Sequence, residues 1–233
     1  MEKQTILEQQ AAYYRARAAE YDEWFYRVGR YDKGGSLNQL WFDEAAQLRS
    51  ALHSLPLLDT ALELACGTGI WTQELLKVAT HITALDASPE MLTLNQAKLN
   101  ASDRVNYAQA DLFQWQPDGE YDLVFFSFWL SHVPPDLLDQ FLAKVYQAVK
   151  PGGYLFLIDS RRESTSTAHD HTLPNEGDIY QERKLNDGSN FMIVKIFYTV
   201  VPLQQALERT GFEVTVTETP TYFIYVSGIR PAH

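Results

Sequence analysis

The chain has 233 residues, of which 45% are hydrophobic and 21% charged, a composition that supports a buried core and excludes wholesale disorder. Its 19 Lys and Arg residues against 30 Asp and Glu residues give a formal net charge of −11. That charge argues against nucleic acid as the main partner and against docking on an anionic membrane, although a locally basic pocket is compatible with it. With Cys66 as its single cysteine, the chain cannot form an internal disulfide. No signal peptide or membrane helix of roughly 18 apolar residues is evident, so we expect a cytoplasmic protein.

Residues 1–55 are predicted to form a helical amino-terminal segment. A first helix is expected over residues 6–25, which are rich in Ala and contain no Gly or Pro, and a second over residues 36–52. The first segment also carries a heavy aromatic load, including Tyr14 and Tyr21. Such a face either packs on the protein core or forms a lid over a ligand, and both interpretations remain open from the sequence.

Residues 56–233 are predicted to form the main domain, because short apolar runs alternate there with longer amphipathic segments. Strands are expected over residues 61–65, 81–85, 105–108, 123–126 and 154–158, and helices over 70–78, 89–100 and 135–149. This alternation is typical of right-handed crossovers and of a mostly parallel sheet in an α/β fold.

The carboxyl-terminal third interrupts that alternation. A polar stretch is followed by two strand-like runs, 180–185 and 191–198, around a hairpin signal at Asp187-Gly188. We therefore predict that residues 161–200 are an inserted loop and β-hairpin that cap the substrate. A helix over 202–210 and two antiparallel strands, 214–218 and 222–227, follow at the end.

The sharpest chemical feature is a glycine-rich turn. Leu62-Glu63-Leu64-Ala65-Cys66-Gly67-Thr68-Gly69 leads from a strand into a helix, where small residues allow a ligand to approach the backbone. A nicotinamide dinucleotide site uses a similar turn but requires a third glycine, and Thr72 stands at that place. The pattern therefore disfavours a nicotinamide-dependent oxidoreductase. Cys66 itself is interpreted as a small buried filler rather than a nucleophile.

Two acidic residues follow the next strands. Asp86 ends the second strand and can accept hydrogen bonds from both ribose hydroxyls of a nucleoside, whereas Asp111 follows the third strand and can accept from an exocyclic amine such as that of adenine. Either residue alone could be a solvated loop acid. Polar groups at three consecutive strand ends, on the edge where such sheets bind ligands, together indicate a nucleoside site.

With these motifs in their observed order, the sequence resembles the class I S-adenosylmethionine-dependent methyltransferases, in particular the small-molecule group that includes quinone-biosynthesis enzymes. The matching segments are residues 63–69, 86–92, 110–112, 121–124, 131–134 and 150–153. The resemblance implies a Rossmann-like, doubly wound, seven-stranded, mostly parallel sheet with an antiparallel last strand. The helical amino-terminal extension and the small β-hairpin cap fall outside the matched region.

The resemblance also implies S-adenosyl-L-methionine as the cofactor and assigns residues to it. The methionine part would lie near the glycine turn, the ribose at Asp86 and the adenine amine at Asp111. The full set of implied cofactor-binding residues is Glu63, Ala65, Gly67, Gly69, Asp86, Ala87, Met91, Asp111, Leu112, Ser127 and Phe128.

Methyl transfer from a sulfonium is an in-line displacement, in which the protein chiefly aligns donor and acceptor. If the acceptor must lose a proton, His132 is the best candidate base, with a structural role as the alternative. Tyr14 and Tyr21 are rival bases or positioning groups. The further candidates for substrate contact are Tyr31, Trp129, Arg161 and Arg162, although the two arginines could simply be exposed.

We expect a methyltransferase that acts on an O, N or C atom of a small, possibly aromatic molecule. The alternative is a non-catalytic module that binds S-adenosylmethionine as a sensor or as the partner of an active enzyme. No metal is expected, because His169-x-His171 is too short and isolated for a metal site. The protein is expected to be a monomer or a homodimer.

Overall fold

The computed structural model describes residues 3–100 and 103–232 and is built around one large β-sheet. The sheet has seven strands in the order β3-β2-β1-β4-β5-β9-β8, in which β9 runs antiparallel to both neighbours and the remaining pairs are parallel. Its strands are β1 (Leu58–Leu64), β2 (Ala79–Asp86), β3 (Val105–Gln109), β4 (Tyr121–Ser127), β5 (Val149–Ser160), β8 (Glu213–Glu218) and β9 (Phe223–Ile229). The predicted Rossmann-like α/β fold with an antiparallel last strand is confirmed.

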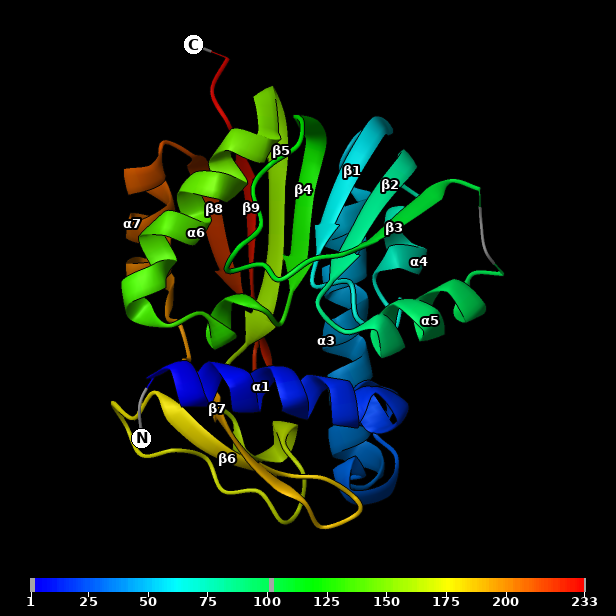
Figure 1. Cartoon of the computed structure of the whole chain (residues 1–233), viewed down its shortest axis with the longest axis vertical. Coiled ribbons are helices and arrows are strands. Elements are labelled where there is room, and N and C mark those ends of the chain that lie inside the picture. Colours follow the sequence, from blue (N-terminus) through cyan, green and yellow to red (C-terminus); the bar gives the residue numbers. More distant parts are fainter. Residues whose placement is uncertain (1–2, 101–102, 233) are drawn as a thin grey trace.

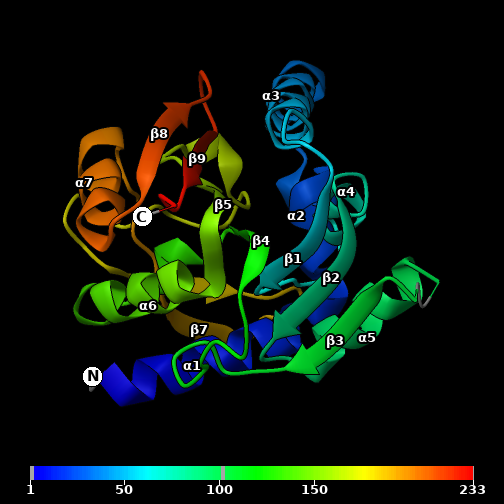
Figure 2. The same cartoon turned by 90° about the horizontal axis from the view of Figure 1, so that it is seen from above.

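Helices cover both faces of this sheet (Figures 1 and 2). They are α1 (Lys3–Arg17), α2 (Tyr21–Tyr26), α3 (Gly35–His53), α4 (Thr72–Leu75), α5 (Pro89–Lys98), α6 (Pro135–Ala148) and α7 (Val200–Thr210). Four 3₁₀ turns, η1 (Ala18–Glu20), η2 (Gly29–Tyr31), η3 (Leu130–His132) and η4 (Ser164–Ser166), join them. The second, two-stranded sheet is an antiparallel hairpin of β6 (Tyr180–Lys184) and β7 (Asn190–Val194). None of the helices in these described ranges has the length and apolar character needed to cross a membrane.

The amino-terminal helix predicted over residues 6–25 is interrupted in the structure. α1 ends at Arg17, η1 follows, and α2 ends where Arg27 takes a left-handed φ of 57°. The interruption follows from two different packing partners: Tyr13 in α1 is buried against the β6–β7 hairpin, whereas Phe25 in α2 is buried in the core on the sheet.

Other predicted elements also differ in length, three of them for an evident reason. The helix predicted over residues 70–78 is reduced to the single turn α4, because the chain must enter β2 only a few residues later. The hairpin strand predicted over 191–198 ends at Val194, since the Ile196 amide donates instead to a carbonyl in η3. The strand predicted over 154–158 is longer at both ends, because β5 begins before the Pro-Gly-Gly turn and continues to Ser160.

The sheet divides the core into two halves. Along β4, Leu123 and Phe125 face the half that α3, α4 and α5 cover, whereas Val124 and Phe126 face the half under α6 and α7. All four side chains are fully buried. A strand that is apolar on both faces is typical of the centre of a parallel sheet covered by helices on either side.

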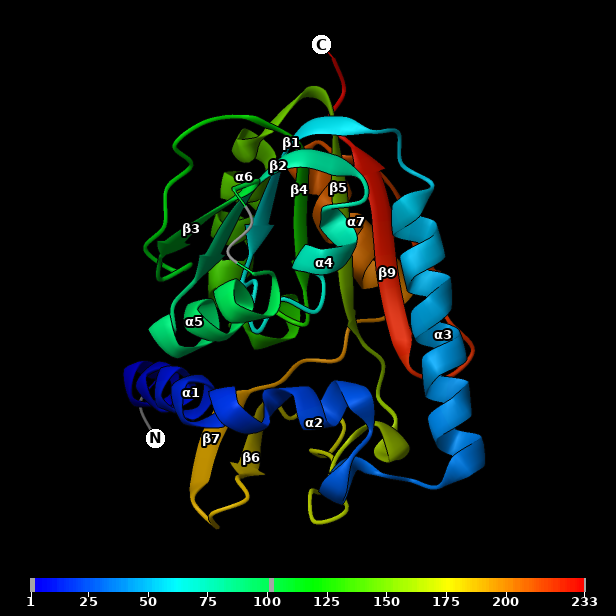
Figure 3. The same ribbon diagram turned by 90° about the vertical axis from the view of Figure 1, so that its right-hand side faces the viewer.

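The segment α2–α3 is part of this core. Trp41 of α3 is fully buried, its ring lies 4.6 Å from that of Phe223 in β9, and its Nε1 donates a hydrogen bond to the Phe25 carbonyl at 3.0 Å. Figure 3 shows α3 running beside β9 at the edge of the molecule. The aromatic residues of α2 and α3 therefore fasten the amino-terminal segment to the sheet.

α1 lies across the carboxyl ends of the parallel strands, with the β6–β7 hairpin on its far side (Figure 1). An apolar cluster of Tyr13, Leu185 and Ile193 joins helix and hairpin. The side chains of Gln9 and Gln10 accept hydrogen bonds from two amides of β7 at 2.9 and 3.0 Å. Since these amides lie on the free edge of the hairpin, α1 satisfies donors that an edge strand otherwise exposes.

A buried chain of hydrogen bonds positions the glycine-rich turn after β1. Tyr107 Oη donates to Asn95 Oδ1 at 2.8 Å, Asn95 Nδ2 donates to Thr72 Oγ1 at 2.9 Å, and Thr72 Oγ1 donates to Glu63 Oε2 at 2.7 Å. Burial raises the pKa of Glu63 to about 8, although the Thr72 hydroxyl opposes the shift. The Glu63 carboxyl is therefore protonated in the folded chain at neutral pH.

Gly69 is required by the same network. A Cβ at this position would lie 2.6 Å from Asn95 Oδ1, and the backbone has a φ of 89° that disfavours other residues. Thr72, which occupies the place of a third glycine, supplies the hydroxyl that joins Asn95 to Glu63. The Thr72 side chain thus has a structural role that a glycine could not fill.

We predict that α3 contributes strongly to stability. Leu48→Ala removes a fully buried side chain from the core and should lower the free energy of unfolding by about 2–5 kcal/mol, as measured by urea denaturation. The same substitution at Leu57, which is 76% exposed, should change it by less than about 0.5 kcal/mol. Equal effects at the two positions would contradict the packing described for α3.

We also predict that Glu63 makes stability depend on pH. Between about pH 5 and pH 8 the folded chain keeps a proton on this carboxyl that the unfolded chain releases, so stability falls as pH rises. Glu63→Gln retains an oxygen acceptor for Thr72 but cannot titrate. Thermal unfolding measured across this range should therefore show a shallower decline for Glu63→Gln than for the wild type. Glu213→Gln, at an exposed position, serves as the control, and parallel curves for Glu63→Gln and the wild type would refute the assignment.

Candidate active site

A cavity of about 370 Å³ lies between α1 and the carboxyl ends of the parallel strands. The segments that follow β1 to β4 form one side of it through Ala65, Gly67, Asp86, Ala87, Ser88, Met91, Asp111, Leu112, Phe113, Gln114, Ser127, Phe128, Trp129 and His132. The amino-terminal helices form the other side through Gln4, Leu7, Glu8, Gln10, Ala11, Tyr14, Arg15 and Tyr21. Residues far apart in the sequence thus enclose one space at the edge where parallel sheets bind ligands.

Asp86 is the central acid of this cavity. Its carboxylate accepts hydrogen bonds from the Gly67 amide and from the Ser88 amide, each at 2.9 Å. Burial raises the pKa of Asp86, and the two amide hydrogen bonds act against that rise. The turn can approach this carboxylate because Ala65 and Gly67 both take a left-handed φ of 53°.

Two further strand ends complete the side of the cavity near β2 and β3. Met91 is buried in the first turn of α5, which begins with a Ser88 side-chain cap on the Met91 amide at 3.2 Å. Asp111 is exposed after β3 and accepts from the Phe113 amide at 2.9 Å, while Leu112 is buried beside it. An exposed acid next to an apolar wall can bind the amine and the face of a flat heterocycle.

The end of β4 brings aromatic side chains to the cavity. Phe128 takes a left-handed φ of 54°, and its ring lies 4.7 Å from that of Trp24 in an edge-to-face arrangement. Trp129 packs against Phe113 at 5.3 Å. A β-branched or bulky residue with positive φ is uncommon and marks strained backbone at this position.

Tyr14 and His132 form a hydrogen-bonded pair in the wall. The Nδ1 atom of His132 lies 2.6 Å from the carbonyl oxygen of Val194, which can only accept, so Nδ1 carries the proton. Nε2 is therefore the acceptor for the Tyr14 hydroxyl at 2.6 Å. Burial and the positive charge of Lys195 hold the pKa of His132 well below its usual value, and burial raises the pKa of Tyr14. Both side chains are neutral at physiological pH.

A second, smaller cavity of about 50 Å³, hereafter the inner cavity, adjoins the first. The two share Tyr14, Tyr21, Phe128 and His132. The remaining residues that line the inner cavity are Tyr13, Arg17, Trp24, Tyr31, Ser160, Ser166, Thr167, Leu173, Arg183, Lys195 and Phe197. It is enclosed by the helical amino-terminal segment, the loop after β5 and the β6–β7 hairpin.

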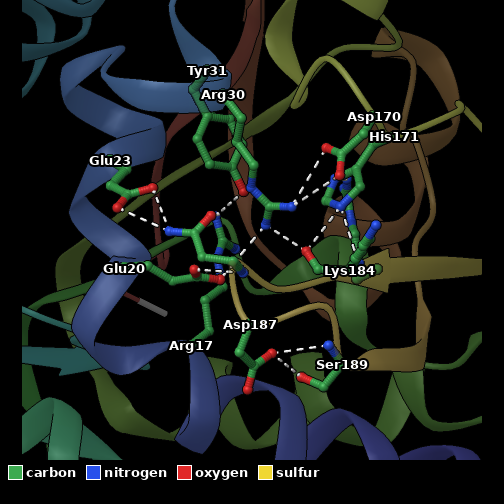
Figure 4. A network of polar contacts seen from close by, with 12 residues as sticks. Arg17, Glu20, Glu23, Arg30, Tyr31, Asp170, His171, Lys184, Asp187 and Ser189 are labelled. Atoms are coloured by element: carbon green, nitrogen blue, oxygen red, sulfur yellow. Dashed lines mark hydrogen bonds and ion pairs between the residues drawn. The ribbon is translucent and has the colours of Figure 1, made fainter.

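Polar contacts hold these enclosing segments together (Figure 4). Arg30 donates hydrogen bonds to the Lys184 carbonyl and to Asp170, and it forms an ion pair with Glu20 at 3.6 Å. Glu20 in turn accepts from the backbone amide of Asn186 at 2.9 Å. The amino-terminal segment and the hairpin are therefore joined at the hairpin tip as well as along α1.

The structure brings most of the predicted site residues together. Of the expected cofactor-binding residues, the large cavity is lined by Ala65, Gly67, Asp86, Ala87, Met91, Asp111, Leu112, Ser127 and Phe128. Tyr14, Tyr21, Trp129 and His132 line it too, and Tyr31 lines the inner cavity. Glu63 and Gly69 do not line either cavity but support the turn from beneath through the hydrogen-bond network with Asn95.

Arg161 and Arg162 lie elsewhere. They line a separate surface cavity of about 440 Å³ rather than the two joined cavities. The Arg161 guanidinium donates to the Thr219 carbonyl and pairs with Glu218 at 3.4 Å, and Arg162 donates to the Pro174 carbonyl. Arg161 therefore points to the end of β8 and Arg162 to the loop at Pro174, so neither side chain lines the two joined cavities.

The His169-x-His171 segment forms hydrogen bonds that hold the loop after β5 against its neighbours. His169 Nε2 lies 2.6 Å from the Asp32 carbonyl, and the Lys184 amide donates to His171 Nε2 at 3.0 Å. Within the part of the chain that the structure describes, no three His, Cys, Asp or Glu side chains gather to form a metal site.

Three basic residues that line the inner cavity were not predicted from the sequence as site residues. Arg17 follows an aromatic run in the first helix, and Lys195 interrupts the apolar run Met192-Ile193-Val194. A cation next to apolar or aromatic residues was the available signal, although Arg15 beside Arg17 weakens it there. Arg183 offered none, because it lies in a polar strand of the hairpin.

Comparisons with known proteins agree with this geometry. A family model described as "Methyltransferase domain" matches residues 61–153. The structure of DhpI in complex with SAH is 34% identical in sequence, with a TM-score of 0.79 and full coverage of both chains. A complex of DhpI with SAM and HEP is 35% identical, with a TM-score of 0.80 over 98% of this chain and 99% of that one.

Curated relatives match over shorter stretches. An uncharacterised methyltransferase of Synechocystis sp. is 36% identical over 48% of this chain and 55% of its own length. The ubiquinone biosynthesis O-methyltransferase of Hydrogenovibrio crunogenus is 31% identical over 56% of this chain and 61% of its own length. The chain thus spans about half to three fifths of these two relatives, whereas it matches DhpI from end to end. On this evidence the chain belongs to the S-adenosylmethionine-dependent methyltransferase family, whose cofactor is S-adenosyl-L-methionine.

Proposed function

We propose that this chain transfers the methyl group of S-adenosylmethionine to a small acceptor molecule bound in the inner cavity. The observation that carries the proposal is the junction of two cavities, the larger of nucleoside-binding character, which have four lining residues in common. A donor in the first and an acceptor in the second would meet at Phe128 and the Tyr14–His132 pair.

The chemistry of the large cavity fits the cofactor. Asp86 offers carboxylate oxygens where a ribose would lie, and Asp111 offers one to an amine, with Met91 and Leu112 as apolar neighbours. The small residues Ala65 and Gly67 leave room for a ligand against the backbone. Among the described residues that line this cavity there is no Lys, and the one Arg, Arg15, is largely exposed, which suits a nucleoside without a pyrophosphate.

S-adenosylmethionine, when bound, supplies a methyl carbon on a sulfonium sulfur; transfer forms a bond from that carbon to the acceptor atom and breaks the carbon–sulfur bond. The protein's share of the work is to align the two reactants and to exclude water. α1, η2 and the hairpin support this role because they enclose the inner cavity. We therefore assign residues 1–55 in part, and residues 161–200, to the enclosure of the acceptor.

His132 suits a positioning role better than that of a general base. A pKa well below its usual value means a weak affinity for the acceptor's proton. Its Nε2 accepts from Tyr14 and its Nδ1 donates to the hairpin, so His132 fixes the Tyr14 hydroxyl at the junction of the cavities. Tyr14 and Tyr21 then present their rings and hydroxyls to both reactants.

The small size of the acceptor has independent support. The DhpI complex with SAM and HEP pairs the cofactor with a second component in a chain that this one matches almost end to end. The relatives named for ubiquinone and menaquinone biosynthesis also act on small molecules by their names. Neither finding favours a non-catalytic binding module.

The activity can be tested with S-adenosylmethionine that carries a deuterated methyl group. The pure protein and a small-molecule extract should yield a product with a labelled methyl group, detected by mass spectrometry. Asp86→Asn should weaken cofactor binding roughly tenfold to a hundredfold in calorimetry, as expected for a lost charge-assisted contact, and should reduce product accordingly. Asp118→Asn, at an exposed position after β3, should leave both unchanged. Cofactor binding without any labelled product would instead favour the sensor or partner module.

The role of His132 predicts a specific pH profile. Because its pKa is depressed, His132 stays neutral throughout about pH 6 to pH 8 and gains a proton only at more acidic pH. The kcat of the wild type should therefore show no inflection near pH 6.5, and His132→Asn should lower kcat without changing the shape of the profile. A wild-type inflection near pH 6.5 that vanishes in His132→Asn would establish His132 as the base. Tyr14→Phe, which removes only the hydroxyl of the pair, should lower kcat similarly.

A further inference from the structure

Arg17 is a buried cation without a matching anion. Its side chain leaves α1 beside the inner cavity, the residue is only 9% exposed, and its Nε atom has no hydrogen-bond partner. The guanidinium lies 4.8 Å from the ring centre of Tyr21, and its Nη2 is 3.5 Å from the Tyr31 hydroxyl, a weak contact (Figure 4). A guanidinium is always charged and is costly to bury unless it is paired.

Among the described residues that line the inner cavity, none carries a carboxylate. Glu20, the acid nearest to Arg17 in the chain, is bound by Arg30 and by the Asn186 amide instead. In the described residues neither Arg17 nor Arg183 forms an ion pair, whereas the ion pairs elsewhere account for most other arginines. The inner cavity therefore has an excess of positive charge in a chain whose net charge is −11.

Arg183 and Lys195 bring further charge from the hairpin side. Arg183 donates to the Thr167 hydroxyl at 2.7 Å and lies 3.0 Å from the Nδ1 atom of His171, so these two neighbours supply no negative charge. Lys195 is 4% exposed and is balanced by Asp159 at 3.4 Å. The two guanidinium groups consequently have no counterion among the described residues, and they reach the cavity from α1 and from β6.

We propose that the inner cavity binds a small anionic group of the acceptor, a carboxylate or a phospho group, between Arg17 and Arg183, with Lys195 adding positive charge. This inference rests on the proposed methyl transfer and names the acceptor class of that same site. Guanidinium groups bind the oxygens of such anions through directional, charge-assisted hydrogen bonds. The Tyr31 hydroxyl, which accepts from Arg17, still has a proton to donate to such an anion, whereas the Tyr14 proton is held by His132.

The size and position of the cavity agree with such a group. A volume of about 50 Å³ exceeds several times the ~10–15 Å³ that one water molecule needs, so it holds a head group rather than a large ring system. The cavity shares Tyr14, Tyr21, Phe128 and His132 with the larger one. An anion held at Arg17 would thus anchor an acceptor whose reacting atom lies at the shared wall, facing the cofactor.

The test is calorimetry with two probe anions. Inorganic phosphate and acetate are each titrated into the full chain, both alone and saturated with S-adenosylhomocysteine. At least one anion should bind with one-to-one stoichiometry, and the preferred one identifies a phospho or a carboxylate acceptor. Arg17→Gln should weaken this binding roughly tenfold to a hundredfold, as expected for the loss of a charge-assisted hydrogen bond. Arg209→Gln, which removes the same charge from an exposed site on α7, should leave it unchanged.

A second variant keeps the test decisive if Arg17→Gln folds poorly. Arg183→Gln changes a half-buried side chain on the hairpin and should also weaken anion binding while S-adenosylhomocysteine affinity stays within about twofold. Binding of neither anion at about 10 mM to protein that binds S-adenosylhomocysteine would overturn the anion site and leave methyl transfer intact. Loss of anion binding in Arg209→Gln to the same extent would also overturn it. Failure to bind S-adenosylhomocysteine would instead refute the proposed function.

Discussion

The buried hydrogen-bond chain from Tyr107 through Asn95 and Thr72 to Glu63 is the contact on which the site depends. Its members come from β3, α5, α4 and β1, so one polar relay fixes four separate elements around the glycine-rich turn. Inside a low-dielectric core each bond strengthens its neighbours, and each lost partner leaves an expensive unpaired group. The protonated state of Glu63 belongs to the same constraint, because a buried charged carboxylate would have no cation to balance it.

A second layer of structure rests on that framework. α2 and α3 are fastened to the sheet through aromatic packing around Trp41, which leaves α1 free to cross the strand ends and meet the hairpin. The turn η1 separates α1, which packs on the hairpin, from α2, which packs on the sheet. Enclosure of the cavities and stability of the core are therefore carried by different parts of the amino-terminal segment, which is why one aromatic helix could be interpreted in two ways from its sequence.

Local motifs made the sheet and its ligand-binding edge predictable. Gly67, Asp86 and Asp111 each follow a short apolar strand, and parallel strands bring such positions to one edge whatever the rest of the chain does. Arg17 and Lys195 were not predictable in the same way, since their meeting depends on the docking of α1 against a hairpin that lies more than 160 residues away. Arg161 does follow β5 as predicted, but its side chain points to Glu218 and the Thr219 carbonyl at the end of β8, and these partners could not be predicted from the sequence around Arg161.

The glutamines of α1 have a consequence for how the molecule opens. By accepting from the β7 amides, Gln9 and Gln10 replace the neighbouring strand that this edge lacks. The same helix carries Tyr14 and Arg17. α1 therefore both covers the free edge of β7 and forms part of the wall of the two cavities. An extended peptide that paired with β7 would have to displace α1. Displacement of α1 would expose both cavities to solvent. Backbone pairing at the free edge of β7 and enclosure of the two cavities are thus mutually exclusive, because the same face of α1 covers that edge and encloses the cavities.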